Sequence, residues 1–174
     1  MLNAKLAMGM IVGTLAFGPA AFAFDCPAQG LEQDAADAFA KASRLHSANA
    51  FASSASRFTD MRALALFALG SYRSQLPPGM EGKYVSLAKI FMGRFMAKNA
   101  GVIGDSALTI VSCSPQLVSA RMGGNSIYFK LSGNRITDVT VSGFSIAHAM
   151  REKFVGIISD NGGDVNALIS YLQG

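Results

Sequence analysis

The apolar positions in the C-terminal part of the chain follow a helical period. After Gly143, apolar residues three or four positions apart form one face: Ile146, Met150, Phe154, Ile157 and Ile158. Gly162 and Gly163 interrupt this pattern, and Asp164 can cap a second segment with the same period: Val165, Leu168, Ile169 and Leu172. The pattern predicts two amphipathic helices joined by a glycine turn.

Helical patterns also fill the first half of the chain. Residues 31–49 are rich in alanine with one apolar side, and the Ser-rich stretch 53–56 predicts a break after this helix. Residues 60–73 are apolar almost all round, so we expect that helix to be buried. A third helix, residues 80–98, carries Tyr84, Leu87, Ala88, Phe91, Met92 and Phe95 on one side and several basic residues toward the other.

After Gly101 the apolar period changes to two. Alternating segments are found at residues 108–113, 117–122, 127–131 and 136–141, and short linkers rich in Ser, Pro, Gly and Asn separate them. Such linkers favour antiparallel hairpins. Four consecutive strands between helices predict an α+β fold, in which helices cover one face of a four-stranded antiparallel sheet.

Two blocks of this sequence together resemble a known family. The first contains Asp138-Val-x-Val-x-Gly, then Arg151-x-x-Phe, then Gly162-Gly-Asp-Val-x-Ala-Leu. The second contains Phe58-Thr-Asp-Met-Arg, then Phe67-Ala-Leu-Gly-Ser-Tyr-Arg, Leu76-Pro77, Tyr84 and the Phe91 to Phe95 region. Order and spacing resemble the MlaC (toluene-tolerance) family of periplasmic lipid carriers. This chain lacks the Trp that often precedes the Asp-Val pair, with Asn134 near that place.

The resemblance implies a curved four-stranded sheet wrapped by helices, with a shape similar to nuclear-transport-factor-like and cystatin-like proteins. It also implies that acyl chains lie between sheet and helices and that the head group lies at the mouth. We therefore expect the helix face of Phe91 to lie toward the sheet face that carries Phe129. The expected ligand-binding residues are Leu69, Tyr72, Leu87, Phe91, Phe95, Phe129, Leu131, Val139, Val141, Phe144 and Met150.

The ligand and partners implied by the resemblance are those of a lipid shuttle. The ligand would be a phospholipid or a related amphiphile such as a hopanoid. Partners would be an outer-membrane lipoprotein complex and an inner-membrane ABC transporter with a lipid-binding ring. Such a shuttle supports the lipid asymmetry of the outer membrane in a Gram-negative cell, and it is not an enzyme.

The first 23 residues have the pattern of a signal peptide. Lys5 is the only charge before Asp25, an apolar run extends from Leu6 to Phe17, and Ala21-Phe22-Ala23 fits a signal-peptidase site. Cleavage after Ala23 would leave residues 24–174 as one periplasmic domain. The alternatives are a retained membrane anchor, for which the apolar run is short, and a lipoprotein, which Asp25 before Cys26 disfavours.

Cys26 and Cys113 are the only cysteines. In an oxidising compartment an isolated pair favours a disulfide, which would attach the N-terminal end of the mature chain to the sheet. Two unrelated buried thiols are the alternative. A redox role is disfavoured because there is no Cys-x-x-Cys motif.

Charge and polar chemistry exclude several function classes. The net charge of +4 falls to +3 when Lys5 leaves with the signal, which suits anionic head groups but lacks the clustered basic and aromatic residues of nucleic-acid proteins. His46 and His148 have no ligand partners at metal-binding spacing, no cofactor motif is present, and Ser145 is expected to cap a helix.

An enzyme with a nuclear-transport-factor-like shape is the alternative function. It would be an isomerase or dehydratase that acts on a hydrophobic substrate, with Asp138 as base and Tyr72 or Tyr128 as oxyanion donor. A simpler interpretation makes Asp138 a residue that binds a turn or a sheet edge.

Overall fold

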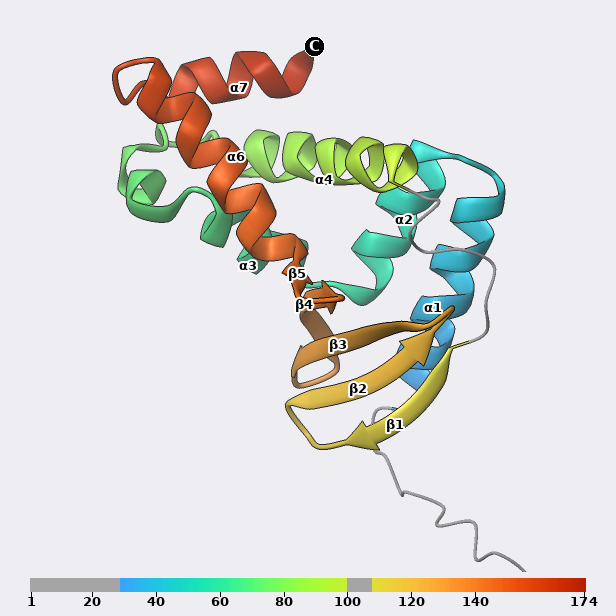
Figure 1. The fold of residues 1–174 in the computed structure, drawn as a ribbon. Coiled ribbons are helices and arrows are strands. Elements are labelled where there is room, and N and C mark those ends of the chain that lie inside the picture. The colour runs from blue at the N-terminus through green and yellow to red at the C-terminus, as the bar shows by residue number, and fades with distance from the viewer. Residues whose placement is uncertain (1–28, 100–107) are drawn as a thin grey trace, which may run out of the picture.

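The computed structural model describes residues 29–99 and 108–174, so Cys26, the predicted disulfide and the signal segment lie outside the described residues. A group of helices is followed by the strands of a sheet and then by two more helices. The order is α1 (Gln29–Arg44), α2 (Ala48–Phe58), α3 (Met61–Ala68), η1 (Gly70–Gln75), α4 (Glu81–Lys98), β1 (Thr109–Cys113), β2 (Leu117–Met122), β3 (Asn125–Ser132), β4 (Arg135–Val141), β5 (Phe144–Ser145), α6 (Ile146–Asp160) and α7 (Val165–Gln173). The predicted α+β class is confirmed (Figure 1).

The sheet has five antiparallel strands in the order β1-β2-β3-β4-β5. The prediction of four strands is wrong because Ser142 and Gly143, with φ of 49° and 86°, form a tight hairpin turn. This turn folds the chain back on β4, where Phe144 pairs with Val141. A strand of two residues is too short to show an alternating pattern, so periodicity does not predict it.

One face of the sheet packs against α1 and the end of α2. Its apolar cluster comprises Val118, Ala120, Met122, Ile127, Phe129, Leu131 and Ile136 from the strands, with Ala35 and Phe58 from the helices. In Figure 1, α1 runs beside the sheet, and α2 begins near the C-terminal end of α4 and runs back toward the sheet. The residues that alternate out of this face include Tyr128 and Leu117, which are exposed.

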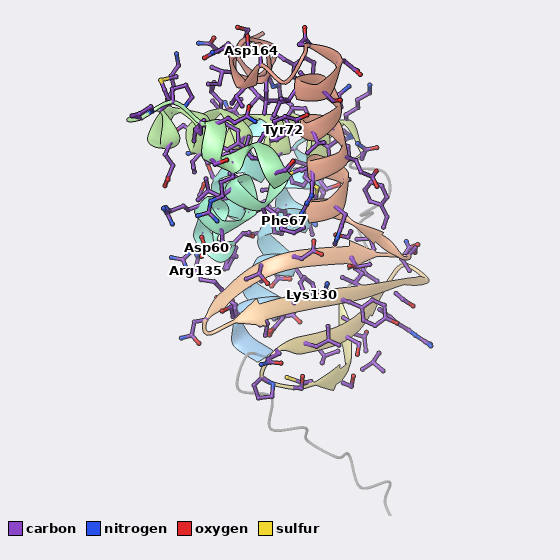
Figure 2. All side chains as sticks on the ribbon, turned by 90° about the vertical axis from the view of Figure 1, so that its left-hand side faces the viewer. Asp60, Phe67, Tyr72, Lys130, Arg135 and Asp164 are labelled. Carbon is purple, nitrogen blue, oxygen red and sulfur yellow. The ribbon has the colours of Figure 1, made fainter. Side chains whose placement is uncertain are left out.

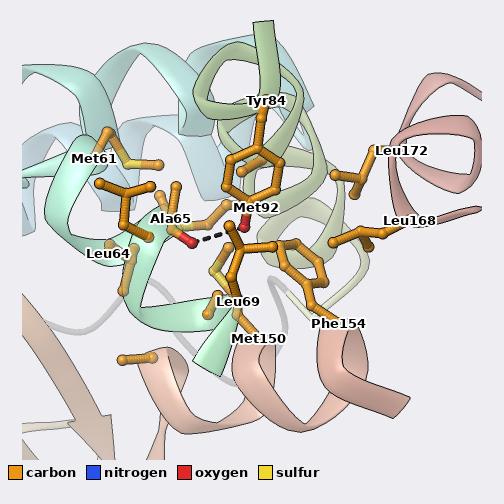
Figure 3. Packing of buried hydrophobic residues seen from close by; sticks show 14 of the residues in the cluster. Met61, Leu64, Ala65, Leu69, Tyr84, Met92, Met150, Phe154, Leu168 and Leu172 are labelled. Atoms are coloured by element: carbon orange, nitrogen blue, oxygen red, sulfur yellow. Dashed lines mark hydrogen bonds between the residues drawn. The ribbon is translucent and has the colours of Figure 1, made fainter. Parts of the chain in front are cut away.

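A second apolar cluster holds α3, α4, α6 and α7 together (Figure 3). Tyr84, Phe154 and Leu168 are fully buried at its centre, and the Tyr84 ring meets the Phe154 ring edge-on at 6.4 Å between centroids. In Figure 1, α6 rises from β5 and α7 returns alongside α4. The described residues therefore form two large cores, one mostly of helices and one of sheet plus α1, and a small third cluster around Ala42 and Phe51 joins α1 to α2.

The α2–α3 junction connects the two cores. The backbone N–H of Asp60 donates to the carbonyl of Ile136 in β4 at 3.1 Å, and Arg135 Nη1 donates to the carbonyl of Arg57 at 2.7 Å (Figure 2). The Asp60 side chain caps α3 by accepting from the N–H of Ala63. These bonds fix where the helical layer meets β4.

Helix boundaries differ from expectation at two places. The predicted break at residues 53–56 is wrong, since that stretch lies inside α2. The chain instead turns at His46, whose φ is 47°, and Ser47 caps α2 by accepting from the N–H of Ala50. The predicted helix 60–73 ends early, because Gly70 with φ of 57° converts its last part into the 3-10 turn η1.

Two of the predicted caps are confirmed. Ser145 caps α6 by accepting from the N–H of His148, and Asp164 caps α7 by accepting from the N–H of Asn166. In the described ranges, no helix has both the length and the apolar character needed to cross a bilayer.

Candidate functional site

A groove of about 520 Å³ opens between α4, α6 and α7. The residues that line it are Phe91, Arg94, Phe95, Lys98, Ala149, Met150, Lys153, Tyr171 and Gly174. The C-terminal half of α4 supplies four of them, α6 supplies Ala149, Met150 and Lys153, and α7 supplies Tyr171. This volume falls within the roughly 300–1,000 Å³ typical of ligand pockets.

The floor of the groove is aromatic. Phe91 stands at its centre, with ring centroids 5.1 Å from Phe154, 6.4 Å from Phe95 and 6.2 Å from Tyr171. Phe91 and Phe95 are four residues apart on α4, so their rings stack along one helix face. Buried Met150 of α6 adds a flexible apolar surface.

The rim of the groove is cationic. Arg94 Nη2 donates to the carbonyl of Leu172 near the end of α7 at 2.9 Å. The Lys153 ammonium lies 5.4 Å from the centroid of the Tyr171 ring, and Lys98 occupies the last turn of α4. The lining residues include no Asp or Glu. Apolar floor and basic rim together suit an amphiphile.

A much smaller void lies where the two cores meet. Its volume is about 30 Å³, and it is lined by Phe39, Thr59, Leu64, Met92, Met96, Ile136, Thr137, Asp138, Val139 and Ile146. That is the volume of about one water molecule. An acyl chain does not fit in this void in this conformation. Beside it, a pocket of about 370 Å³ opens between α3, α6 and the strands β3 and β4, and its lining residues are Ala63, Leu64, Phe67, Lys130, Thr137, Asp138, Ala147 and His148.

The structure brings together only some of the expected ligand-binding residues. Phe91, Phe95 and Met150 line the groove, and Val139 lines the void. Leu69 is buried in the helical core, where Leu87 and Tyr72 pack partly buried against it; Figure 2 shows Tyr72 between Phe67 and Asp164. Val141 packs against the sheet core, while Phe144 is exposed.

The expected facing of Phe91 and Phe129 is wrong. The ring neighbours of Phe91 all belong to α4, α6 and α7, whereas Phe129 and Leu131 pack in the cluster of the sheet and α1. Sequence reasoning also missed Arg94, Lys98, Lys153, Tyr171 and Ala149 as groove residues. The spacing of four between Arg94 and Lys98, beside that of Phe91 and Phe95, is the sequence signal that could have indicated a basic edge.

Asp138 is buried and has a structural role. Its Oδ2 accepts from the Ser145 hydroxyl at 2.7 Å, and its Oδ1 accepts from the N–H of Ala147 at 3.0 Å. Lys130 Nζ lies 4.0 Å away. Among the described residues, neither Tyr72 nor Tyr128 donates to it. The carboxylate thus fixes the first turn of α6 against β4, which favours the turn-binding interpretation over a catalytic base.

Comparisons with known proteins give one informative structural neighbour. No family model matches the chain, and no curated protein matches it. A solved structure of a phospholipid-binding protein from Ralstonia solanacearum, in complex with a phospholipid, is similar over 84% of this chain and 94% of that chain. The TM-score is 0.64 and the sequence identity is 17%. The similarity shows a shared fold, and that neighbour binds a phospholipid.

Proposed function

We propose that this protein is a carrier that holds a phospholipid, or a related amphiphile, in the groove between α4, α6 and α7. The observation that carries the proposal is the groove itself, with an aromatic floor centred on Phe91 and a rim formed by Arg94, Lys98 and Lys153. The shared fold with a phospholipid-binding protein supports it.

The physical basis is the transfer of acyl chains from water to an apolar surface. Each buried methylene contributes about 0.8 kcal/mol, so a chain that covers Phe91, Phe95 and Met150 gains several times that amount. Burial of a polar or charged group there would oppose binding, and the charged groups of the groove are at its rim. The acyl chains of an amphiphile would therefore contact the aromatic floor, and its head group would contact the basic rim.

The cellular role that we propose is that of a shuttle in the periplasm. After cleavage following Ala23, the carrier would move lipid between an outer-membrane lipoprotein complex and an inner-membrane ABC transporter with a lipid-binding ring, in support of outer-membrane lipid asymmetry. The signal pattern in residues 1–23 and the family resemblance support this role. N-terminal sequencing of the exported protein should begin at Phe24.

The decisive test is to fill the groove without disturbing the cores. Ala149 is a small, half-buried lining residue, so Ala149→Trp places a bulky ring where chains would lie. Ser159→Trp is the control, because Ser159 is exposed on the same helix and does not line the groove. Lipid that co-purifies with each protein is identified and counted by mass spectrometry after gentle extraction.

We expect wild type and Ser159→Trp to carry lipid and Ala149→Trp to carry much less, with all three unfolding at similar urea concentrations. Wild-type protein without lipid would contradict the carrier function. Full occupancy in Ala149→Trp would move the chains away from the groove, toward the junction beside Val139.

A further inference from the structure

We infer that the groove selects amphiphiles whose head group carries a net negative charge, and that Arg94, Lys98 and Lys153 recognise that charge. This inference rests on the proposed function, since it names the chemical class of the head group. It depends on the charges around the groove and on how each cation is held.

No carboxylate side chain of the described residues forms a salt bridge with a rim cation. Within residues 29–99 and 108–174 no salt bridge involves any of the three, and no acidic side chain lines the groove. Three cations outside the groove do approach a carboxylate: Arg57 lies 4.0 Å from Asp34, Arg62 Nε lies 2.6 Å from Glu81, and Lys130 lies 4.0 Å from Asp138. The groove therefore concentrates positive charge, and no acidic side chain of its lining competes with a ligand for that charge.

Two of the cations are held in place by neighbouring groups. Arg94 uses Nη2 to bind the Leu172 carbonyl, which leaves other donors of its five N–H groups for a second acceptor. A guanidinium so anchored suits the oxygens of a phosphate. The Lys153 ammonium is drawn to the face of Tyr171. Both charges thus remain beside the aromatic floor.

The arrangement of the groove indicates that the anionic group belongs to an amphiphile. A free phosphate would use only the rim, whereas Phe91 and Phe95 present an apolar surface directly beside Arg94 and Lys98 on the same helix. A phosphate ester joined to acyl chains would contact both the cationic rim and the apolar surface. A zwitterionic head group brings a cation into the same basic surroundings, so its net attraction is smaller.

Competition between two lipids in the same vesicle measures this selectivity. The mature protein is incubated with vesicles that contain equal amounts of phosphatidylglycerol and phosphatidylcholine with identical chains, and bound lipids are counted by native mass spectrometry. Because both lipids share one membrane, attraction of the protein to the vesicle surface cancels from the ratio. Added glycerol 3-phosphate, which lacks chains, should leave the bound lipid in place.

Two double variants distinguish the effect of charge at the groove rim from the effect of the net charge of the protein. Lys98→Gln with Lys153→Gln should lower the bound ratio of phosphatidylglycerol to phosphatidylcholine by about fivefold per lysine, while total occupancy of phosphatidylcholine persists. Lys41→Gln with Lys83→Gln removes the same charge from exposed positions outside the groove and should leave the ratio unchanged.

Four results would overturn the inference. A wild-type ratio of one would remove the selectivity and leave the carrier function standing. An equal fall in both double variants would assign the preference to the overall charge. Binding of neither lipid would overturn the proposed function and the selectivity with it, and displacement by glycerol 3-phosphate would make the ligand a small phosphate.

Discussion

The hydroxyl of Tyr84 in α4 donates a 2.7 Å hydrogen bond to the carbonyl of Ala65 in α3, inside the helical core (Figure 3). Burial raises the pKa of this phenol above its ordinary range. The bond satisfies a polar group in a cluster that is otherwise apolar, and it connects two of the helices that support the groove.

Tyr84→Phe should lower the free energy of unfolding by about 1–3 kcal/mol, because the Ala65 carbonyl loses its buried donor. Urea denaturation at pH 7 measures this change. Tyr171→Phe is the control: Tyr171 is exposed, and loss of its hydroxyl should change stability by less than about 0.5 kcal/mol. Equal effects of the two variants would contradict the role of the Tyr84 bond.

The same pair predicts a pH effect. The pKa of Tyr84 is higher in the folded than in the unfolded state, so its stabilising contribution is complete below the unfolded value of about 10 and is lost as pH rises above it. The stability difference between wild type and Tyr84→Phe should therefore shrink above about pH 10. A difference that grows with pH would contradict this sign.

Two helical glycines predict opposite outcomes for the same substitution. A Cβ on Gly93 in α4 would lie 2.4 Å from the carbonyl oxygen of Ala48 in α2, closer than atoms pack. Gly93→Ala should therefore push these helices apart and cost about 1–3 kcal/mol of stability. Gly156 in α6 has open space at the same position. Gly156→Ala should stabilise by about 0.5–1 kcal/mol through lower entropy of the unfolded chain.

Thermal and urea unfolding of both glycine variants measure the contrast. A Gly93→Ala protein that is as stable as wild type would mean that α2 and α4 separate at no cost. Because Gly93 adjoins Met92 and Arg94, which face the void and the groove respectively, we also expect altered lipid occupancy in that variant and unchanged occupancy in Gly156→Ala.

The fold was largely readable from the sequence, and the groove was not. Periodicity located the strands β1 to β4 but not β5, and capping residues such as Ser145 and Asp164 marked where α6 and α7 begin. Phe91 was expected to bind a ligand because of its helix face and the family resemblance, and it lines the groove. Which element lies opposite that face is a tertiary relationship, and nothing local to Phe91 distinguishes Tyr171 of α7 from Phe129 of the sheet.

Asp138 provides a test that also addresses the enzyme alternative. Asp138→Ala leaves the buried N–H of Ala147 without its acceptor and should cost about 1–3 kcal/mol of stability. Asp138→Asn keeps a carbonyl oxygen that can accept from Ala147 and should cost less. Urea denaturation ranks the two, and lipid occupancy should survive in Asp138→Asn. If Asp138→Asn and Asp138→Ala were equally destabilising, the hydrogen bond to α6 would not explain the contribution of Asp138 to stability.

Glu32 in α1 is the most unusual polar residue of the described chain. Its side chain is fully buried, and neither carboxylate oxygen has a hydrogen-bond partner. Burial raises the pKa of the Glu32 carboxyl above its ordinary value. The folded state therefore holds a proton that the unfolded chain releases more readily, and the charged form destabilises the fold.

The sign of the pH effect follows from that raised pKa. Below the unfolded value of about 4.3 both states are protonated and Glu32 carries no charge penalty, and stability is lost as pH rises through the raised folded value. Glu32→Gln, which cannot ionise, should unfold at higher urea concentration than wild type at pH 7 and at a similar concentration at pH 3. Glu152→Gln, at an exposed position, is the control and should match wild type at pH 7. A Glu32→Gln protein that is less stable than wild type at pH 7 would mean that the carboxylate is charged and favourably solvated in the folded state, which contradicts its burial.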